Sequence, residues 1–393
     1  MAKHRDVILV LLITVLYHTM NQMFVPTFPI YIAERGGDEV LVGLLVGLIP
    51  LGSIVAKSFF GKMSTRRSNL LVLRLGLIVA TLVILLYFPF WGFGFLALVR
   101  LLQSIGLAGY VTGSQGLMAE QTTPANRGFF FGVYAAMIGV GMTAGPLLGS
   151  FLAEGFGYKA LFGGAALVAG LAAALGFAVG RGPVGAKPGM GRRYQPHSPW
   201  KNRRLMIVCG TMVAGAAVLG ATSAMLALHA AAVGLGNGSL FFALYALTFT
   251  AGGAAAGALS DRLSRTVLIV PGFCLLILGM VFLSVLNGAV VLALAGVTAG
   301  LGLGTVNAVL LAMVPGYSIN EVDAANDLAF FANAFDLGVV LGSFGFSFLA
   351  ARSFSLFWLA VAALGVLGLL FYLRHNPEGQ GTGIGTQTKQ AQV

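Results

Sequence analysis

The sequence predicts an all-α membrane protein, with twelve transmembrane helices that form two pseudo-symmetric six-helix bundles. Three observations lead to this fold class. Of the 393 residues, 58% are hydrophobic and only 9% are charged. The apolar residues form long continuous stretches, and the second half of the chain repeats motifs of the first. A helix needs roughly 20 apolar residues to cross a bilayer, and continuous apolar stretches without alternation favour helices over a β-barrel.

The apolar stretches give twelve candidate spans. Their ranges are 7–33, 40–60, 70–90, 92–119, 128–153, 157–180, 205–233, 238–260, 267–286, 288–317, 327–350 and 354–373. The segments 70–119 and 267–317 each allow other divisions into two helices. The one long polar interruption is rich in Gly, Pro and Arg. We therefore predict an N-terminal six-helix bundle (1–180), a cytoplasmic basic linker (181–204), a C-terminal six-helix bundle (205–375) and a disordered tail (376–393).

The basic residues are distributed unevenly between the two sides of the predicted membrane. If both termini are cytoplasmic, 17 of the 23 Lys and Arg residues fall in cytoplasmic segments, and only Arg35, Lys159 and Arg352 fall in outer loops. This asymmetry predicts a multi-pass inner-membrane protein with both termini in the cytoplasm. The net charge of +11 then reflects topology. Basic residues scattered over several loops argue against a nucleic-acid partner.

Motifs for enzymatic chemistry are absent from the sequence. It contains no P-loop, no HExxH or CxxC spacing and no Gly-x-Ser-x-Gly elbow, and Cys209 and Cys274 both fall within spans. We therefore expect neither an enzyme nor a cofactor or metal requirement. No polar segment is long enough for a nucleotide-binding domain. A transporter of this kind would draw energy from an ion gradient or from the substrate's own gradient, and we expect it to be a monomer.

Three sequence motifs recur in order at nearly one offset. GKMSTRRSNLLVL (61–73) returns as GALSDRLSRTVLI (257–269), and Gly106-Leu107 returns as Gly302-Leu303, both 196 residues later. GMTAGPLLGSFLA (141–153) returns as GVVLGSFGFSFLA (338–350) with an offset of 197. This order predicts two parallel six-helix halves related by an axis along the membrane normal.

These motifs resemble those of the major facilitator superfamily over essentially the whole chain, and most closely its 12-helix drug:proton antiporter branch. GALSDRLSR is similar to the family loop G-x-L-a-D-R-x-G-R, whereas Thr65 replaces the Asp in GKMSTRRSN. LVRLLQSIGLAG is similar to R-x-x-q-G, and GVGMTAGPLLGS is similar to the antiporter motif G-x-x-x-G-P-x-x-G. The resemblance implies efflux by alternating access. The motif residues expected to act in the conformational change are Gly141, Gly145, Pro146, Gly149, Gly257, Asp261, Arg262 and Arg265.

The glycines of the third motif recur at i+4. Gly141, Gly145 and Gly149 would leave a stripe without side chains, where another helix can approach closely, and Pro146 should bend the helix locally. Such a stripe suits two helices that stay packed while one bundle rocks against the other. The alternative is an ordinary packing stripe.

Charged residues within the spans are few, and each costs roughly 2.5–3.5 kcal/mol at a helix centre on insertion scales. We expect Lys57 and Arg74 to snorkel to the cytoplasmic face, and Asp327 to act as an acid at a helix N-terminus. Asp336 lies near mid-membrane in span 327–350. Because burial makes its charged form costly, we predict that Asp336 carries the coupled proton. The alternative is an Asp that bonds neighbouring helices permanently.

Arg100 lies at a height similar to that of Asn21 in span 7–33. We predict that Arg100 approaches Asn21, Gln22 or His18 and organises spans 1 and 4, with a structural hydrogen-bond hub as the alternative. His18 can titrate near physiological pH, although a packing histidine is the competing interpretation. The proton-coupling candidates are therefore Asp336, His18 and Arg100. Drug:proton antiporters often carry an acid in span 1, and this chain has none between Asp6 and Glu34.

The remaining substrate-binding candidates are polar or aromatic residues on spans expected to line the central cavity. The full set is Tyr17, Asn21, Gln22, Phe24, Gln103, Tyr110, Tyr245, Asn307, Phe331 and Asn333. Few fixed charges line this predicted cavity, so the sequence favours proton-coupled efflux of a small amphipathic or weakly charged organic molecule. The partners would be that substrate, protons and the lipid bilayer. Three alternatives remain: a gradient-independent facilitator of sugars or metabolites, a lipid or lysolipid transporter, and a non-transporting scaffold.

Overall fold

The computed structural model describes residues 2–123, 126–180, 198–260, 262–319 and 321–377, and these residues form helices and no strands. The helices of the first half are α1 (Ala2–Gln22), α2 (Phe28–Ala33), α3 (Glu39–Arg66), α4 (Asn69–Leu85), α5 (Phe93–Gln121), α6 (Arg127–Phe156) and α7 (Tyr158–Ala178). Those of the second half are the 3-10 turn η1 (Pro199–Lys201), α8 (Arg203–Ala232), α9 (Ser239–Leu259), α10 (Arg265–Ser284), α11 (Ala289–Tyr317), α12 (Glu321–Gly345), α13 (Ser347–Ala350) and α14 (Phe354–His375).

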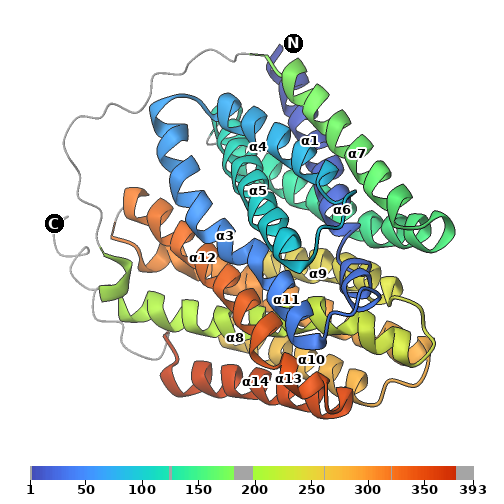
Figure 1. The fold of residues 1–393 in the computed structure, drawn as a ribbon. Helices are drawn as coiled ribbons and strands as arrows, with labels where there is room; N and C mark the ends of the chain where they lie inside the picture. The colour runs from blue at the N-terminus through green and yellow to red at the C-terminus, as the bar shows by residue number, and fades with distance from the viewer. Residues whose placement is uncertain (1, 124–125, 181–197, 261, 320, 378–393) are drawn as a thin grey trace, which may run out of the picture.

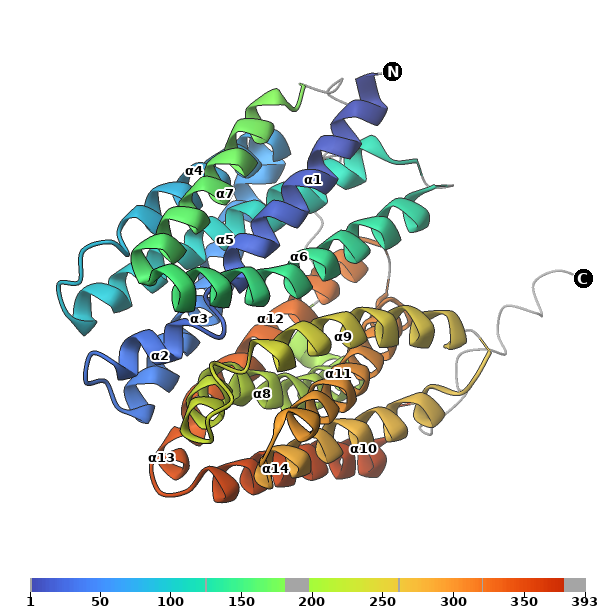
Figure 2. The ribbon, with the colours of Figure 1, turned by 90° about the vertical axis from the view of Figure 1, so that its right-hand side faces the viewer.

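The described residues form twelve helices of 17 residues or more, in two bundles of six (Figure 1). One bundle holds α1 and α3–α7, and the other holds α8–α12 and α14 (Figure 2). Ten of the described helices are long and apolar enough to cross a membrane, and α4 is a shorter apolar helix. Helix α1 is not among the ten, because polar residues occupy both of its ends. The predicted fold class is confirmed.

Four predicted spans differ from the helices by five residues or more. Span 40–60 is one of them, because α3 continues to Arg66. Span 7–33 is divided: α1 ends at Gln22 and α2 begins at Phe28, and Pro26 between them cannot donate a backbone hydrogen bond. Span 327–350 begins earlier, because α12 starts at Glu321 and ends at Gly345. Span 70–90 is shorter, since α4 ends at Leu85. Most of the predicted linker (181–197) and most of the predicted tail (378–393) lie outside the described residues.

Several helices begin where a polar side chain accepts a hydrogen bond from the first turn. The Asp38 carboxylate accepts from the Leu41 N–H at 2.8 Å, and the Ser68 hydroxyl accepts from the Leu71 N–H at 3.1 Å. The Asn202 side chain does the same for α8 at 3.2 Å. Such caps satisfy backbone donors that the helix leaves unpaired. They explain why the apolar stretches begin as helices at these polar boundaries.

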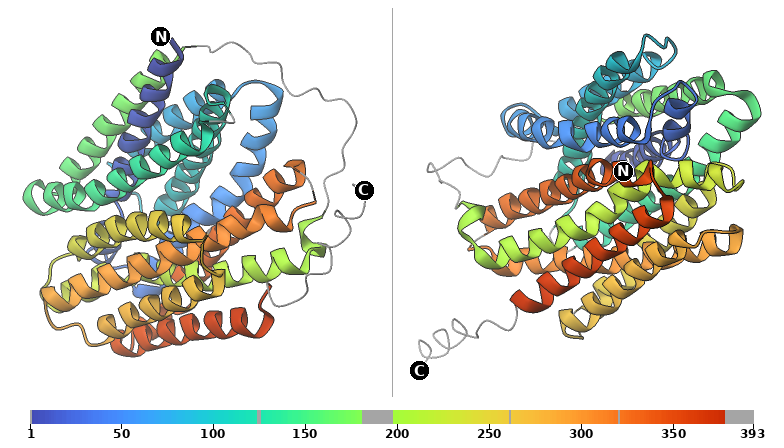
Figure 3. Two further views of the ribbon diagram at one scale, coloured as in Figure 1. Left: turned by 180° about the vertical axis from the view of Figure 1, so that it is seen from behind. Right: turned by 60° about the horizontal axis from the view of Figure 1, so that its bottom comes forward.

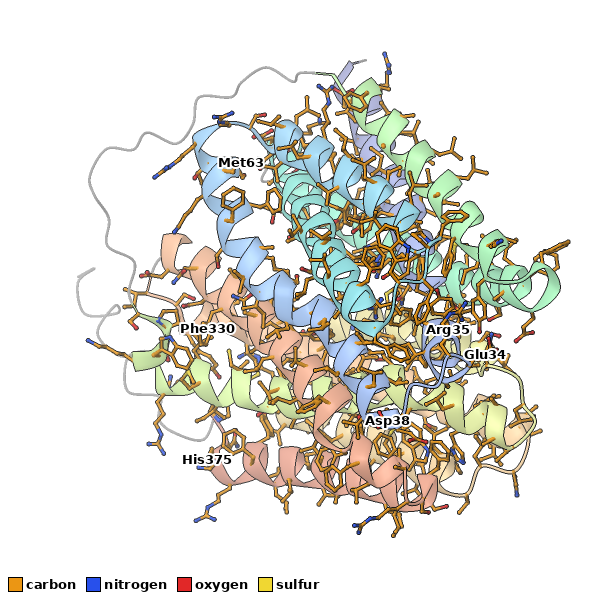
Figure 4. The ribbon with its side chains drawn as sticks, viewed as in Figure 1. Glu34, Arg35, Asp38, Met63, Phe330 and His375 are labelled. Carbon is orange, nitrogen blue, oxygen red and sulfur yellow. The ribbon has the colours of Figure 1, made fainter. Side chains whose placement is uncertain are left out.

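Helix ends define two sides of the molecule. We call the side with the start of α1 and the end of α14 the terminal side, and the opposite side the far side. The far side carries the loops that follow α2, α4, α6, α8 and α10. Figure 4 labels Glu34, Arg35 and Asp38 there, and Met63 toward the terminal end of α3.

Helices α3 and α12 cross between the bundles and form the first seam. A side chain at Gly43 would overlap with Ser347 and with the Ser343 carbonyl, and a Cβ at Gly47 would lie 2.7 Å from the Ser343 hydroxyl. These glycines let the two backbones pack closely on the far side. The two bundles therefore meet where α3 has glycines instead of residues with bulky side chains.

Helices α6 and α9 form the second seam. They run antiparallel to each other, as α3 and α12 do. A Cβ at Gly139 would overlap with the Thr250 side chain, and the Ser150 hydroxyl donates to Asn237 Oδ1 at 2.9 Å near the far side. Two helical turns beyond the Gly139–Thr250 contact, toward the terminal side, lie Gly132 and Gly257. Added Cβ atoms at both positions would meet nothing within 4 Å.

Both seams are thus packed on the far side and separate toward the terminal side. On α3, Gly61 lies one turn beyond Lys57, and a Cβ there would also meet nothing within 4 Å. The terminal halves of α3 and α12 diverge visibly (Figures 1 and 3), and Met63 and Phe330 lie well apart in Figure 4. The structure is therefore closed on the far side and open on the terminal side.

Candidate substrate and proton-coupling site

An ion pair joins the two bundles in the first seam. The Lys57 ammonium on α3 donates to the Asp336 carboxylate on α12 at 2.6 Å. The two side chains are 22% and 15% exposed, so the pair is largely buried yet still reached by solvent from the open side. The expectation that Lys57 snorkels to the membrane face is wrong, because the crossing of α3 and α12 gives it a buried carboxylate partner.

A small cavity lies between the bundles. Its volume is about 60 Å³, and its lining residues are Asn21, Phe24, Val25, Phe28, Pro29, Val46, Ile49, Arg100 and Ser223. Ser223 belongs to α8, whereas the others come from the first bundle. The backbone break between α1 and α2 shapes one wall, and interrupted helices near a bundle interface are a common feature of transporter binding sites.

Arg100 lines this cavity while being only 6% exposed. Its Nε donates to the Leu45 carbonyl at 3.1 Å, and its Nη1 donates to Gln103 Oε1 at 3.4 Å. The guanidinium carbon lies 4.1 Å from the centroid of the Phe28 ring, a cation–π contact. These neutral partners fix the direction of the guanidinium fork.

Gln103 links Arg100 to the first helix. Its Nε2 donates to Asn21 Oδ1 at 3.4 Å, and its Oε1 also accepts from the Tyr87 hydroxyl at 2.6 Å. The predicted approach of Arg100 to Asn21 is therefore indirect and runs through Gln103. No hydrogen bond between described residues joins Arg100 to Gln22 or His18.

His18 lies in an aromatic cluster inside the first bundle. The rings of Tyr17 and Tyr110 stack with centroids 3.8 Å apart, and the His18 ring meets the Tyr110 ring edge-on at 5.6 Å. A second pair extends the cluster, since the Ser114 and Tyr134 hydroxyls lie 2.8 Å apart. Tyr17, His18 and Tyr110 thus lie together but apart from the cavity around Arg100, an environment that suits the packing interpretation of His18.

The other candidates of the second bundle do not line the cavity. Tyr245 is buried and stacks between Phe241 and Phe249 along α9. Phe331 is buried in α12, and Asn307 and Asn333 are half-buried in α11 and α12. Phe24, by contrast, lines the cavity as predicted for a substrate-binding residue, and Gln22 packs its Cβ against Gly145.

The glycine stripe of α6 packs within its own bundle. Cβ atoms at Gly141 and Gly145 would approach the α1 backbone to 2.7 and 2.6 Å, and one at Gly149 would overlap with Met23. The Ser150 hydroxyl has one proton to share between Asn237 and the Pro146 carbonyl oxygen, which lies 2.8 Å from it. The stripe therefore holds α6 on α1, while a different face of α6 contacts α9 of the other bundle.

The two loop motifs lie on the terminal side. In the first, the Asn69 amide donates to Glu120 at the end of α5 at 2.8 Å, and Ser64 also bonds to Asn69. In the second, Asp261 lies outside the described residues, Arg262 is exposed and Arg265 begins α10. The first loop is thus tied to α5 by a side-chain hydrogen bond.

Asp327 does not occupy the first turn of its helix. Because α12 begins at Glu321, Asp327 lies in the second turn, is buried and accepts from the Ser318 hydroxyl at 2.7 Å. Arg74 likewise caps α7, donating to the Gly176 and Val179 carbonyls at 3.1 and 2.9 Å. The expected interpretation of Asp327 as a first-turn acid is therefore wrong. Arg74 reaches the end of α7 on the terminal side, in agreement with the structural role expected for it near that face.

Several residues of the site were not predicted from the sequence. They include the apolar lining residues Val25, Phe28, Pro29, Val46 and Ile49 and three polar residues. Lys57 and Tyr87 are partners of predicted residues, and Ser223 faces the cavity from the opposite bundle. Lys57 offered a signal, because a charge within an apolar span usually has a partner. Ser223 and Tyr87 offered none, since hydroxyl residues are common in such helices.

Two bundles that meet at an interfacial cavity, with their seams closed on one side, define the class of multi-pass membrane transporters. Residues 10–322 match the family model of the Major Facilitator Superfamily, and the chain belongs to this family. The predicted family is therefore confirmed. It is a family of transporters, not of enzymes.

Two curated relatives are drug-resistance proteins. The chain is 26% identical over 132 residues to the quinolone resistance protein NorA of Staphylococcus aureus, covering 34% of each protein. It is 34% identical over 148 residues to the class B tetracycline resistance protein of Escherichia coli, covering 37% of this chain and 36% of the relative. The matches thus span about a third of the length of these relatives.

Solved structures share the fold at low sequence identity. A bacterial homologue of the human lysosomal transporter Spinster, in an inward-facing and occupied conformation, superposes with a TM-score of 0.80 at 14% identity, covering 95% of this chain and 96% of that one. The nucleoside transporter NupG superposes with a TM-score of 0.77 at 13% identity, covering 94% and 98%. At these identities the likeness establishes the fold alone.

Proposed function

We propose that the protein is a secondary transporter that exports a small amphipathic or weakly charged organic molecule in exchange for protons. Alternating access would move the two bundles about their crossing seams. The family supports transport, and the names of the two relatives make quinolones and tetracyclines the first candidate substrates. The positive-inside pattern supports an inner-membrane location with the terminal side in the cytoplasm.

The Lys57–Asp336 ion pair carries this proposal. It lies at the last close contact of α3 and α12 before the two helices separate. When Asp336 is ionised, the pair links the bundles in the terminal-open arrangement. When Asp336 takes up a proton, Lys57 loses its counter-ion in a largely buried place, and this arrangement loses stability relative to the other one.

This linkage works in both directions. If protonation of Asp336 favours the far-open state, then the far-open state must favour protonation by the same free energy. A gradient of one pH unit supplies about 1.4 kcal/mol per proton. In the terminal-open state the ionised pair leaves the cavity ready for substrate from the cytoplasm. After substrate release, Asp336 takes up a proton from the far side. The protonated protein returns to the terminal-open state, and there loss of the proton to the cytoplasm re-forms the ion pair, which stabilises this state and completes the exchange.

Purified protein in liposomes tests the proposal. An imposed pH gradient should drive uptake of a quinolone or of tetracycline, and a pH-sensitive dye should report proton movement in the opposite direction. Asp336→Asn should abolish gradient-driven transport and leave substrate exchange without a gradient largely intact. Asp327→Asn, on the same helix but bonded only within the second bundle, is the matched control and should keep gradient-driven transport.

Two results would contradict parts of this proposal. Undiminished gradient-driven transport by Asp336→Asn would exclude Asp336 as the proton carrier. Wild-type transport at one rate with and without the gradient would identify a facilitator instead of an antiporter.

A further inference from the structure

The interbundle cavity contains a buried cation with no anionic partner. Arg100 is 6% exposed, and its partners are the Leu45 carbonyl, the Gln103 amide and the Phe28 ring, all neutral. No carboxylate in the described part of the chain forms a salt bridge with it. A buried charge without a counter-ion is costly, so a site of this kind favours a ligand that supplies the missing negative charge.

The rest of the lining indicates what else such a ligand carries. Phe24, Phe28, Val46 and Ile49 give apolar walls, and no acidic residue lines the cavity. Its volume of about 60 Å³ suits a small headgroup, because one water-sized probe needs roughly 10–15 Å³. The apolar body of a larger ligand would extend into the space between the bundles.

Ser223 adds a donor from the opposite wall. Two threonines of the same helix, the adjacent Thr222 and the more distant Thr211, donate to carbonyls one turn earlier in α8, at 2.7 and 2.8 Å. The Ser223 hydroxyl makes no hydrogen bond to any described residue, although it lines the cavity. A ligand that bonds both Arg100 and Ser223 would touch both bundles at once.

We infer that this cavity binds the carboxylate of an amphipathic organic monoanion, with Arg100 as the charge partner and Ser223 as a second donor. The inference rests on the proposed transport function and narrows its substrate class. A guanidinium matches a carboxylate because its fork can donate two parallel hydrogen bonds. A cationic amphiphile would instead face the Arg100 charge with no acid in the lining to balance it.

A binding experiment without any gradient tests this inference. Calorimetry on detergent-solubilised protein would compare quinolone and smaller aromatic carboxylates with their uncharged carboxamides of the same shape. Wild-type protein should bind the carboxylates about tenfold or more tightly than the amides. Arg100→Gln should remove this preference, Arg100→Lys should keep part of it, and Ser223→Ala should weaken carboxylate binding several-fold.

Arg74→Lys is the matched control, because Arg74 bonds only carbonyls at the end of α7, away from the cavity. It should bind carboxylates as wild type does. If Arg100→Gln does not fold, Ser223→Ala and Arg100→Lys carry the test. Equal wild-type affinity for carboxylates and amides, no binding of either, or a preference unchanged in both remaining variants would overturn the inference.

The readout separates this inference from the proposed proton coupling. A carboxylate preference in protein that shows no gradient-driven transport would leave the anion site standing and refute the coupling. Gradient-driven transport of uncharged or cationic compounds, without any carboxylate preference in binding, would support the proton coupling and refute the anion site.

Discussion

The Lys57 ammonium lies 2.6 Å from the Asp336 carboxylate, although 279 residues of sequence separate them. The repeat offset places Gly253 and Gly139 at the corresponding positions of the other seam. That seam has a glycine against Thr250 where the first seam has a charge pair. The two seams are therefore alike in backbone packing and different in charge, so protonation can act on one of them alone.

Neutralising one partner of this pair should cost stability. Lys57→Met or Asp336→Asn should lower the free energy of unfolding by about 1–3 kcal/mol, because each leaves a largely buried charge unpaired. The exchanged pair Lys57→Asp with Asp336→Lys should recover part of the loss. Thermal unfolding in detergent measures all four proteins. If the exchanged pair loses as much unfolding free energy as the two single variants together, the contact contributes nothing to stability.

The fold could be predicted because its signals are local. Stretches of apolar residues long enough to cross a bilayer, and motifs repeated 196 residues apart, identify twelve helices in two halves without any tertiary information. The predicted approach of Arg100 to Asn21 came from their similar depth. Depth alone cannot show that Gln103 stands between them, because that depends on helix rotation.

The partners of buried charges could not be predicted for the same reason. Lys57 was assigned to the membrane face from its depth, but the crossing of α3 and α12 turns it toward Asp336. The apolar stretch begins at Asp327 and predicts a helix start there, but α12 begins at Glu321. Crossing angles and packing of distant segments decide such contacts, and no local pattern encodes them.

The glycines of the first seam should control which side is open. Gly43→Ala places a Cβ where Ser347 and the Ser343 carbonyl lie, so it should disfavour closure on the far side. Gly61→Ala, whose Cβ meets nothing within 4 Å, is the matched control. It should not increase opening on the far side.

Thiol labelling from the far side measures this effect. With the native cysteines replaced by alanine, Ser223→Cys reports access to the cavity. A membrane-impermeant maleimide should label it several-fold faster in the Gly43→Ala background than in wild type or Gly61→Ala. Equal labelling rates in all three backgrounds would show that this seam does not set the closed far side.

The Tyr87 hydroxyl should hold the Arg100 network in place. It donates to Gln103 Oε1 at 2.6 Å, and the Tyr87 side chain is fully buried. Tyr87→Phe should lower the free energy of unfolding by about 1 kcal/mol and weaken carboxylate binding, because Gln103 is then free to rotate away from Asn21. Unfolding and calorimetry measure the two effects. Wild-type values for both would assign Tyr87 a packing role only.

The second seam predicts a contact that exists only in the opposite state. In the structure α6 and α9 touch at Gly139 and Thr250, and two turns further toward the terminal side Gly132 and Gly257 face open space. If the bundles rock about the packed region, the antiparallel register brings these two glycines together once the terminal side closes. A disulfide between cysteines at these positions would then lock the far-open state.

The double variant Gly132→Cys with Gly257→Cys is made in a protein without native cysteines. When the first seam is otherwise unchanged, this variant should form the disulfide slowly. Adding Gly43→Ala should speed its formation, because that variant favours the far-open state. Oxidation should stop transport and reduction should restore it, whereas each single cysteine variant should transport under both conditions. Mass spectrometry of the cross-linked peptides and liposome transport give the two readouts. A disulfide that forms fully without any effect on transport would be incompatible with a rocking motion about these seams, because transport would then proceed with the terminal side held shut.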